Sequence, residues 1–296
     1  MKNNVNLRTI GALAGATIFW ASAFSAIRFA LQYYSVGHIA LFRFLTASIL
    51  LIGIAFWKKI GLPKLSDLPY LVLLGIIAFT IYQLALVEGE KTVLAGTASM
   101  IIAASPIIVS ILAAIFYKEH LSLLGWIGSL IGFCGVALIS FRDLISFQLQ
   151  PGALFIFGAA ICISIYNVFQ KHFHQKYSVL QFTVYSVVSG TIFLLFKSPG
   201  LIDAMVNLPF SATASVIYLG IFPTVASFLL WNYGLRQVSA SVASSFHYLT
   251  PVIAVLIAWV WLAELPTWFT MAGGVLTVIG VIIVTRWGKI ITVDHH

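Results

Sequence analysis

The chain has 296 residues, of which 61% are hydrophobic and only 8% are charged. A water-soluble domain carries about 25% charged residues, so this composition excludes an ordinary soluble protein and predicts a chain that lies almost entirely in a lipid bilayer. The formal net charge of +8 does not indicate nucleic-acid binding, because the basic residues lie in short segments between apolar runs rather than in one stripe.

Apolar stretches of the roughly 20 residues needed to cross a bilayer recur along the whole chain. Charged residues and prolines separate them, as Lys58 and Pro63 do after the second stretch. The sequence predicts ten transmembrane helices, over residues 9–31, 36–57, 67–87, 95–117, 121–140, 151–171, 178–197, 211–234, 240–262 and 266–286.

An internal repeat relates the two halves of the chain. The segments Gly96–Pro106 and Ser241–Pro251 both open with small residues and end in a hydroxyl residue followed by proline, and they lie 145 positions apart. The same offset relates Gly89 to Gly234. A fixed offset that holds over many positions is the signature of a duplication.

The duplication predicts two five-helix repeats, over residues 8–141 and 151–286. An odd number of helices per repeat makes the second copy enter the membrane from the opposite side, as in many transporters whose substrate site lies between the halves. We therefore expect an all-α polytopic membrane protein in which ten helices form two inverted repeats around a central cavity.

Charge sets the expected orientation, because cytoplasmic loops collect Lys and Arg. If the N-terminus is cytoplasmic, only Lys91, Arg142 and Lys197 fall in loops on the opposite side. The sequence thus predicts a multi-pass protein with both termini in the cytoplasm, in a bacterial-type inner (plasma) membrane.

Several motifs carry a resemblance to a known family. The segment Trp20–Arg28, the pair Arg43 and Phe44, and the two blocks that end at Pro106 and Pro251 resemble the EamA family of the drug/metabolite transporter superfamily. The likeness covers residues 8–286. It implies ten helices, cytoplasmic termini, and a central cavity lined by the first, third, fourth, sixth, eighth and ninth helices. It also implies transport of small solutes, often export of amino acids or related metabolites.

Two prolines fall near the centres of the fourth and ninth predicted helices. Pro106 and Pro251 each remove one backbone hydrogen bond and kink the helix. One interpretation is a pair of hinges for alternating access, and the other is a pair of static kinks that shape packing. Pro223 has no counterpart in the first half, and we expect a local kink there.

Aromatic and hydrogen-bonding side chains inside these helices are what a small-molecule pocket needs. The small residues near Ser245 also fit close helix packing, which is the alternative interpretation. His247 is an ionisable group inside a predicted helix and is therefore a functional candidate. The candidate cavity residues are Trp20, Ser25, Tyr82, Gln83, Ser99, Tyr166, Asn167, Trp231, Ser245, His247 and Tyr248.

Three charged residues form a candidate gate. Arg28 and Arg43 lie inside predicted helices, and Glu88 lies at the outer end of the third, where it could pair with one of them. The alternative is a permanent structural ion pair. A GxxxG spacing at Gly128 and Gly132 predicts close packing of the fifth predicted helix against the tenth, and the alternative is a seam between two copies of the chain.

The sequence thus favours a secondary transporter, not an enzyme, that moves small metabolites by alternating access, with export of amino acids or related compounds. The alternatives are an organic-cation or drug efflux carrier and, less favoured, an intramembrane enzyme. We expect a monomer whose partners are a small-molecule substrate and the lipid bilayer, with no nucleic acid, no cofactor and no metal site.

Overall fold

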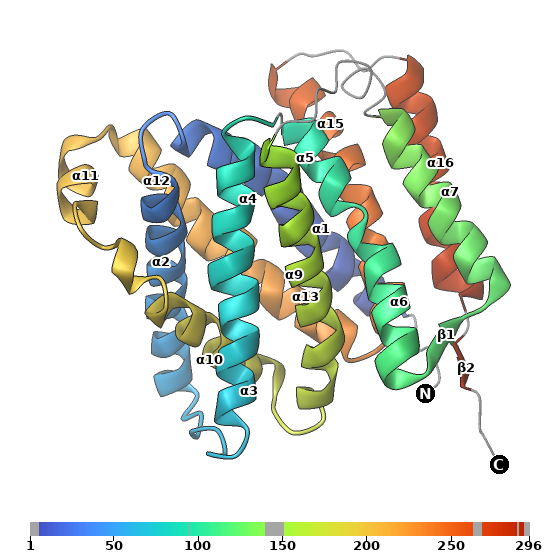
Figure 1. Cartoon of the computed structure of the whole chain (residues 1–296), viewed down its shortest axis with the longest axis horizontal. Helices are drawn as coiled ribbons and strands as arrows, with labels where there is room; N and C mark the ends of the chain where they lie inside the picture. The colour runs from blue at the N-terminus through green and yellow to red at the C-terminus, as the bar shows by residue number, and fades with distance from the viewer. Residues whose placement is uncertain (1–5, 94, 140–150, 263–267, 289, 293–296) are drawn as a thin grey trace.

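The computed structural model describes residues 6–93, 95–139, 151–262, 268–288 and 290–292. This part of the chain is helical apart from one short two-stranded sheet. The following five segments are long and apolar enough to cross a membrane: Leu7–Ala30, Val36–Trp57, Leu68–Glu90, Pro151–Phe173 and Phe210–Leu235. Shorter apolar helices accompany them (Figure 1), so the chain is a polytopic membrane protein.

The first half begins with two long helices and a composite third one. Its elements are α1 (Leu7–Ala30), α2 (Val36–Trp57), α3 (Leu68–Gly75), η1 (Ile76–Ile81), α4 (Tyr82–Glu90), α5 (Ala95–Ile102), α6 (Ser105–Tyr117), β1 (Glu119–Leu121) and α7 (Leu123–Ile139).

The second half has a similar order of long helices, but the short elements η2 and α11 precede α12, η4 lies between α14 and α15, and the strand comes last. The sequence did not predict α11. The elements of this half are α9 (Pro151–Phe173), α10 (Val179–Ile192), η2 (Leu195–Lys197), α11 (Leu201–Asn207), α12 (Phe210–Leu219), η3 (Gly220–Ala226), α13 (Ser227–Leu235), α14 (Ala240–Ser244), η4 (Ser245–Tyr248), α15 (Leu249–Leu262), α16 (Trp268–Trp287) and β2 (Ile290–Thr292).

Polar side chains fix where several helices begin. The side chains of Asn6, Ser35 and Ser239 accept hydrogen bonds from backbone N–H groups of the first helical turn that follows each of them. Ser178 and Gln181 form a reciprocal capping box before α10. Because the first N–H groups of a helix have no partner inside it, these caps supply the missing acceptors.

The third helical segment of each half contains a π-helical stretch. The stretches η1 and η3 lie at matching positions of the repeat, and only η3 contains a proline, Pro223. A π-helical turn takes in one extra residue and leaves carbonyl groups without their usual helical partners. At Pro223, where the sequence predicted a local kink, the structure has the π-helical segment η3. The first half has a similar segment, η1, without a proline.

The prolines of the two repeated blocks do not lie inside continuous helices. The chain turns at Ala103 and Ala104, and Pro106 lies in the first turn of α6. In the second half, a 3-10 segment precedes α15, and Pro251 lies in the first turn of that helix. Proline suits this place because its missing N–H would have no helical partner there. The predicted kinks are thus interruptions that come just before each proline.

The helices α7 and α16 pack closely along their lengths at one edge of the molecule (Figure 1). A Cβ atom added at Gly128 would lie 2.8 Å from Ile283 Cγ2, and one at Gly135 would lie 2.5 Å from Thr277 Oγ1. Glycine permits this close approach, and the predicted packing of the fifth predicted helix against the tenth is confirmed.

The two short strands were not expected from the sequence. In the part of the chain that is described, β1 and β2 pair antiparallel, with Glu119 opposite Thr292 and Leu121 opposite Ile290. Ser122 also donates a hydrogen bond to the carbonyl of Trp287 at 2.7 Å. These contacts join the segment that follows α6 to the chain that follows α16.

Candidate functional site

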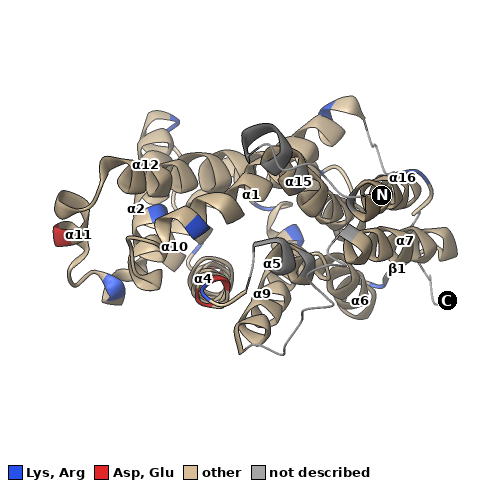
Figure 2. Ribbon diagram, turned by 90° about the horizontal axis from the view of Figure 1, so that it is seen from above, with Lys and Arg blue, Asp and Glu red and all other residues tan. Residues whose placement is uncertain are grey.

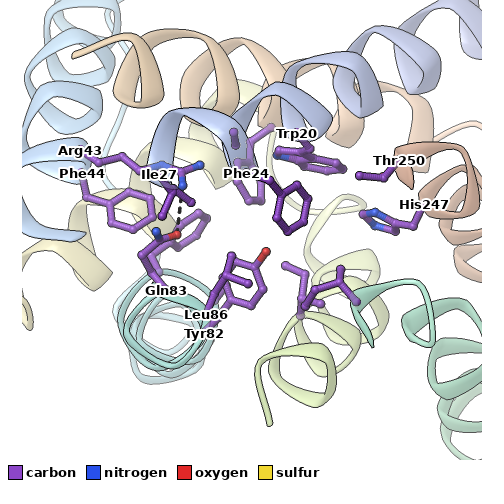
Figure 3. A pocket seen from close by; sticks show the side chains of 16 residues that line it. Trp20, Phe24, Ile27, Arg43, Phe44, Tyr82, Gln83, Leu86, His247 and Thr250 are labelled. Carbon is purple, nitrogen blue, oxygen red and sulfur yellow. Dashed lines mark hydrogen bonds between the residues drawn. The ribbon is translucent and has the colours of Figure 1, made fainter. Parts of the chain in front are cut away.

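A small cavity lies between the two halves of the chain and is lined mainly by aromatic and aliphatic side chains (Figure 3). Its volume is about 40 Å³, which is room for a few water molecules and not for a solute of several heavy atoms. The lining residues are Trp20, Ala23, Phe24, Ile27, Arg43, Phe44, Ala78, Phe79, Tyr82, Gln83, Leu86, Ile102, Ile163, Phe228, His247 and Thr250.

Trp20 is the centre of the aromatic wall. Its ring stacks on His247 at 5.1 Å between centroids, with an interplanar angle of 17°. It also contacts Phe228 edge-on at 5.4 Å and Trp231 at 5.1 Å. Trp231 in turn donates from Nε1 to Asn167 Oδ1 at 3.1 Å. These contacts join α1 to α13, η4 and α9 through one cluster of rings.

The π-helical segment η3 supplies hydrogen-bond acceptors to this wall. Trp20 Nε1 donates to the carbonyl oxygen of Pro223 at 3.0 Å, and Arg43 Nη2 lies 3.4 Å from the same oxygen. Both donors therefore meet one carbonyl oxygen inside the π-helical segment. The distorted turn of the second half is thereby bonded to α1 and α2 of the first.

Arg43 is buried, with 4% of its surface exposed, although it carries a full positive charge. Its Nε donates to Thr224 Oγ1 at 2.8 Å and its Nη1 donates to Gln83 Oε1 at 3.1 Å (Figure 3). These two partners and the Pro223 carbonyl are neutral groups. Since a charged side chain in a membrane interior is costly and marks function, Arg43 is suited to bind an anionic group of a solute.

The structure brings four of the sequence-predicted cavity residues to the cavity wall: Trp20, Tyr82, Gln83 and His247. Three others, Tyr166, Asn167 and Trp231, are buried behind the wall. Tyr166 packs against Phe79 and Phe228, which themselves line the cavity.

The remaining candidates lie away from the cavity wall. Ser25 is exposed on the surface of α1, and Ser99 is buried but does not line the cavity. Ser245 donates to the carbonyl of Val242 at 2.7 Å. Tyr248 faces α7, where a Cβ atom at Gly132 would lie 2.9 Å from its ring. Ser245 thus bonds within its own turn, whereas Tyr248 packs against a neighbouring helix.

The candidate gate has a different carboxylate from the one that the sequence indicated. Glu88 pairs with Lys91 at 2.9 Å, on the half-exposed side of α4. The carboxylate that interacts electrostatically with Arg28 and Arg43 belongs to Glu90, which is 5% exposed. The predicted third helix stopped at residue 87, whereas α4 continues to Glu90. The sequence analysis named Glu88 at this helix end and did not name Glu90.

Several residues that line the cavity are not among the cavity candidates named from the sequence. Phe24 and Ile27 follow Trp20 at helical spacing and line the cavity with it, so the spacing could have identified them. Phe44, Phe228 and Thr250 come from three other elements, and only their packing brings them to the same wall.

At the N-terminus of α3, polar contacts join the two halves of the chain. Asp67 accepts hydrogen bonds from Tyr177 at 2.9 Å and from Lys176 at 3.1 Å. These two donors hold the pKa of the Asp67 carboxyl below its usual value. Nearby, burial, together with the positive charges of Arg236 and Lys171, lowers the pKa of His174 to about 4.

Comparison with known proteins agrees with this arrangement. The model of the EamA-like transporter family matches residues 7–141 and 150–286. The chain is 42% identical over 262 residues to the uncharacterized transporter YdfC of Bacillus subtilis, covering 88% of this chain and 86% of that protein. It is 33% identical over 279 residues to a protein of Streptantibioticus cattleyicolor named a probable terminal-alkyne amino-acid exporter, covering 94% of each chain.

A solved crystal structure shares the fold. It superposes with a TM-score of 0.74 at 18% sequence identity and covers 95% of this chain and 97% of its own. The apolar helices, the two matched family segments and the similarity to transporters over most of the chain agree with one another. The chain is therefore a membrane transporter that belongs to the EamA-like transporter family.

Proposed function

We propose that the chain is a secondary carrier that exports a small metabolite, an amino acid or a related compound, by alternating access. The observation that carries this proposal is the cavity around Trp20, which takes its walls from both halves of the chain. A volume of about 40 Å³ is too small for such a solute. The two halves must therefore separate on one side to admit it.

The interruptions of two helices support this motion. Ile102 ends α5 at one interruption, His247 lies in the other, and both line the cavity. Helix breaks in a membrane are tolerated beside a cavity, where other groups can satisfy the freed backbone. In this proposal α6 and α15 move as rigid helices about the breaks that precede them. Pro106 and Pro251 lie in the first turns of these two helices.

The matching positions of η1 and η3, and of the two interruptions, support ten spans in two inverted repeats, residues 8–141 and 151–286. With this topology both termini are cytoplasmic, and the membrane is a bacterial-type inner membrane. A cavity formed within one chain needs no second copy, so we propose a monomeric carrier.

The solute class follows from the polar part of the cavity. Arg43 offers a buried guanidinium to a carboxylate, and the rings of Trp20 and Tyr82 offer apolar contact. The name of the Streptantibioticus relative also supports an amino acid. An organic cation is the alternative, because aromatic rings attract cations, but the positive charge of Arg43 disfavours it.

The test is counterflow with the purified full chain in liposomes. Vesicles preloaded with an unlabelled amino acid are exposed to the same amino acid carrying a radiolabel, across a panel of the common amino acids. Saturable uptake that depends on the preloaded solute supports the carrier and the solute class. Counterflow of tetraphenylphosphonium alone would replace the amino acid by an organic cation. Uptake that does not saturate would identify a channel instead.

A further inference from the structure

We propose that Glu90 binds and releases a proton during the transport cycle and so couples solute movement to the proton gradient. The proposal rests on the carrier function proposed above. It concerns a residue outside the central cavity wall, at the last position of α4.

Glu90 is a carboxyl group without a bonding partner. Its residue is 5% exposed, and neither of its two carboxyl oxygens has a hydrogen-bond partner within the described part of the chain. Glu88, two positions earlier, is half-exposed and pairs with Lys91 at 2.9 Å. The same helix end thus carries one satisfied carboxylate and one that has no partner.

The charged groups around Glu90 come from two other helices. Arg28 of α1 and Arg43 of α2 interact with it electrostatically, and Tyr82 does so from the same helical segment. Figure 2 shows basic positions on α1 and α2 beside the acidic positions of α4. The carboxyl therefore lies in the field of two guanidinium groups, yet neither donates a hydrogen bond to it.

Among the described residues, the parts of α9 and α5 beside this helix end add no titratable group. Gly89 lies against Gly152 and Ile156 of α9, and residues 151–157 contain no acidic, basic, cysteine or tyrosine side chain. The segment Ala95–Ile102 of α5 contains none either. The titratable groups that face Glu90 are thus Arg28, Arg43 and Tyr82, together with Tyr34, which lines the same cavity, and Glu88 and Lys91 on its own helix end.

Glu90 lines a second cavity and shares a helix face with residues that line the central one. Gln83, Leu86 and Glu90 follow helical spacing along α4, so they share one face. Gln83 and Leu86 line the central cavity. Glu90 and Arg28 line a second cavity of about 560 Å³ with Tyr34, Gln32 and Lys91. Glu90 lies seven positions after Gln83, which is about 10 Å along the helix axis. A proton can thus bind at Glu90 from the second cavity, about 10 Å from the level of Gln83.

This placement gives the proton a mechanical effect. A protonated Glu90 is neutral and exerts no net attraction on the arginines. When the proton leaves, the carboxylate attracts Arg28 and Arg43 and draws α1 and α2 toward α4. The charge state of one side chain therefore changes how strongly three helices hold together at this end, which links proton binding to opening.

The first test needs no solute. The chain has eight acidic residues, so infrared difference spectra of the lipid-reconstituted protein, recorded as pH is changed, resolve few carboxylic C=O bands. We expect a titrating band of a buried carboxylic acid in the wild type and in Glu88→Gln, and its loss in Glu90→Gln. A Glu90→Gln spectrum with the same bands as the wild type overturns the proposal.

The second test uses the radiolabelled amino acid, or tetraphenylphosphonium, that gives counterflow with the wild type. A pH gradient should drive accumulation in the wild type and in Glu88→Gln. With Glu90→Gln, accumulation should fall to the level seen without a gradient, whereas Glu90→Asp, which keeps the carboxyl group, should restore part of it. Accumulation by Glu90→Gln equal to that of the wild type contradicts the proposal.

The two tests separate the proposals from each other. If the wild type shows no counterflow with any probe, the carrier proposal fails, and the infrared band still decides whether Glu90 holds an exchangeable proton. If counterflow occurs but no pH gradient drives accumulation, the carrier stands and the coupling role of Glu90 is rejected. If Glu90→Gln does not fold, Glu90→Asp replaces it in both tests. Its shorter side chain should shift the infrared band of the buried acid and change the accumulation driven by the pH gradient, and wild-type values of both would contradict the proposal.

Discussion

The indole nitrogen of Trp20 donates a hydrogen bond to the carbonyl oxygen of Pro223 at 3.0 Å, across 203 positions of the chain. Pro223 lies in the π-helical segment η3. One bond thus joins the first helix of one half to the irregular turn of the other, directly beside the central cavity.

Trp20→Phe removes this bond and keeps an aromatic ring in the wall. We expect the free energy of unfolding to fall by about 1 kcal/mol, the net contribution of a hydrogen bond, and counterflow to slow because the two halves lose a fixed contact. Thermal unfolding in detergent and counterflow in liposomes measure the two effects. Trp57→Phe is the matched control, because Trp57 is 78% exposed. Equal effects of both substitutions would contradict this role of Trp20.

Arg43→Lys keeps the positive charge but replaces a planar fork with a single ammonium group. The lysine cannot reach Gln83, Thr224 and the Pro223 carbonyl together, so we expect a loss of about 2 kcal/mol of stability, the range for hydrogen bonds to a charged group. The apparent KM for the transported amino acid should also rise. Arg8→Gln, at an exposed position, should leave the unfolding temperature nearly unchanged. A wild-type KM in Arg43→Lys would remove Arg43 from solute binding.

Gly280→Ala tests the packing of α7 against α16. A Cβ atom at Gly280 would collide with the backbone of Gly132 and with the carbonyl of Gly128. We expect a loss of about 1–3 kcal/mol, which is typical of overpacking, read from the unfolding temperature. Gly158→Ala is the control, because no atom lies within 4 Å of a Cβ added there. If the two variants unfold at the same temperature, the helices do not pack as closely as described.

His174 predicts how stability depends on pH. Its residue is 4% exposed, and its pKa is lowered to about 4 in the folded protein, against about 6.5 in an unfolded chain. Between these values the unfolded state binds a proton that the folded state does not. Stability should therefore fall by about 1.4 kcal/mol per pH unit as pH drops from 6.5 toward 4.

Unfolding midpoints measured from pH 7 to pH 4 check this expectation. His174→Phe should remove most of the slope, because phenylalanine keeps a ring against Phe182, which lies 5.2 Å away. The neighbouring residue His172 is exposed, so His172→Phe should keep the slope. An unchanged slope in His174→Phe would mean that another group dominates acid unfolding.

The sequence by itself determined the class of protein and much of its local structure. Its low charge content excluded a soluble domain, and its motifs identified the EamA family. The glycine spacing around Gly128 predicted the packing of α7 on α16. These properties can be inferred from one chain because hydropathy, helix length and glycine spacing are local quantities.

Only the tertiary structure decided which side chains meet. Ser25 and Trp20 lie in the same helix, yet Trp20 lines the cavity and Ser25 is exposed. Glu88 and Glu90 differ in sequence by two positions, but one pairs with Lys91 and the other is buried without a partner among the described residues. In α1, for example, apolar side chains lie on both the buried and the exposed faces, so hydrophobic periodicity separates these faces poorly. Packing against other helices assigns each face to the cavity, the core or the lipid.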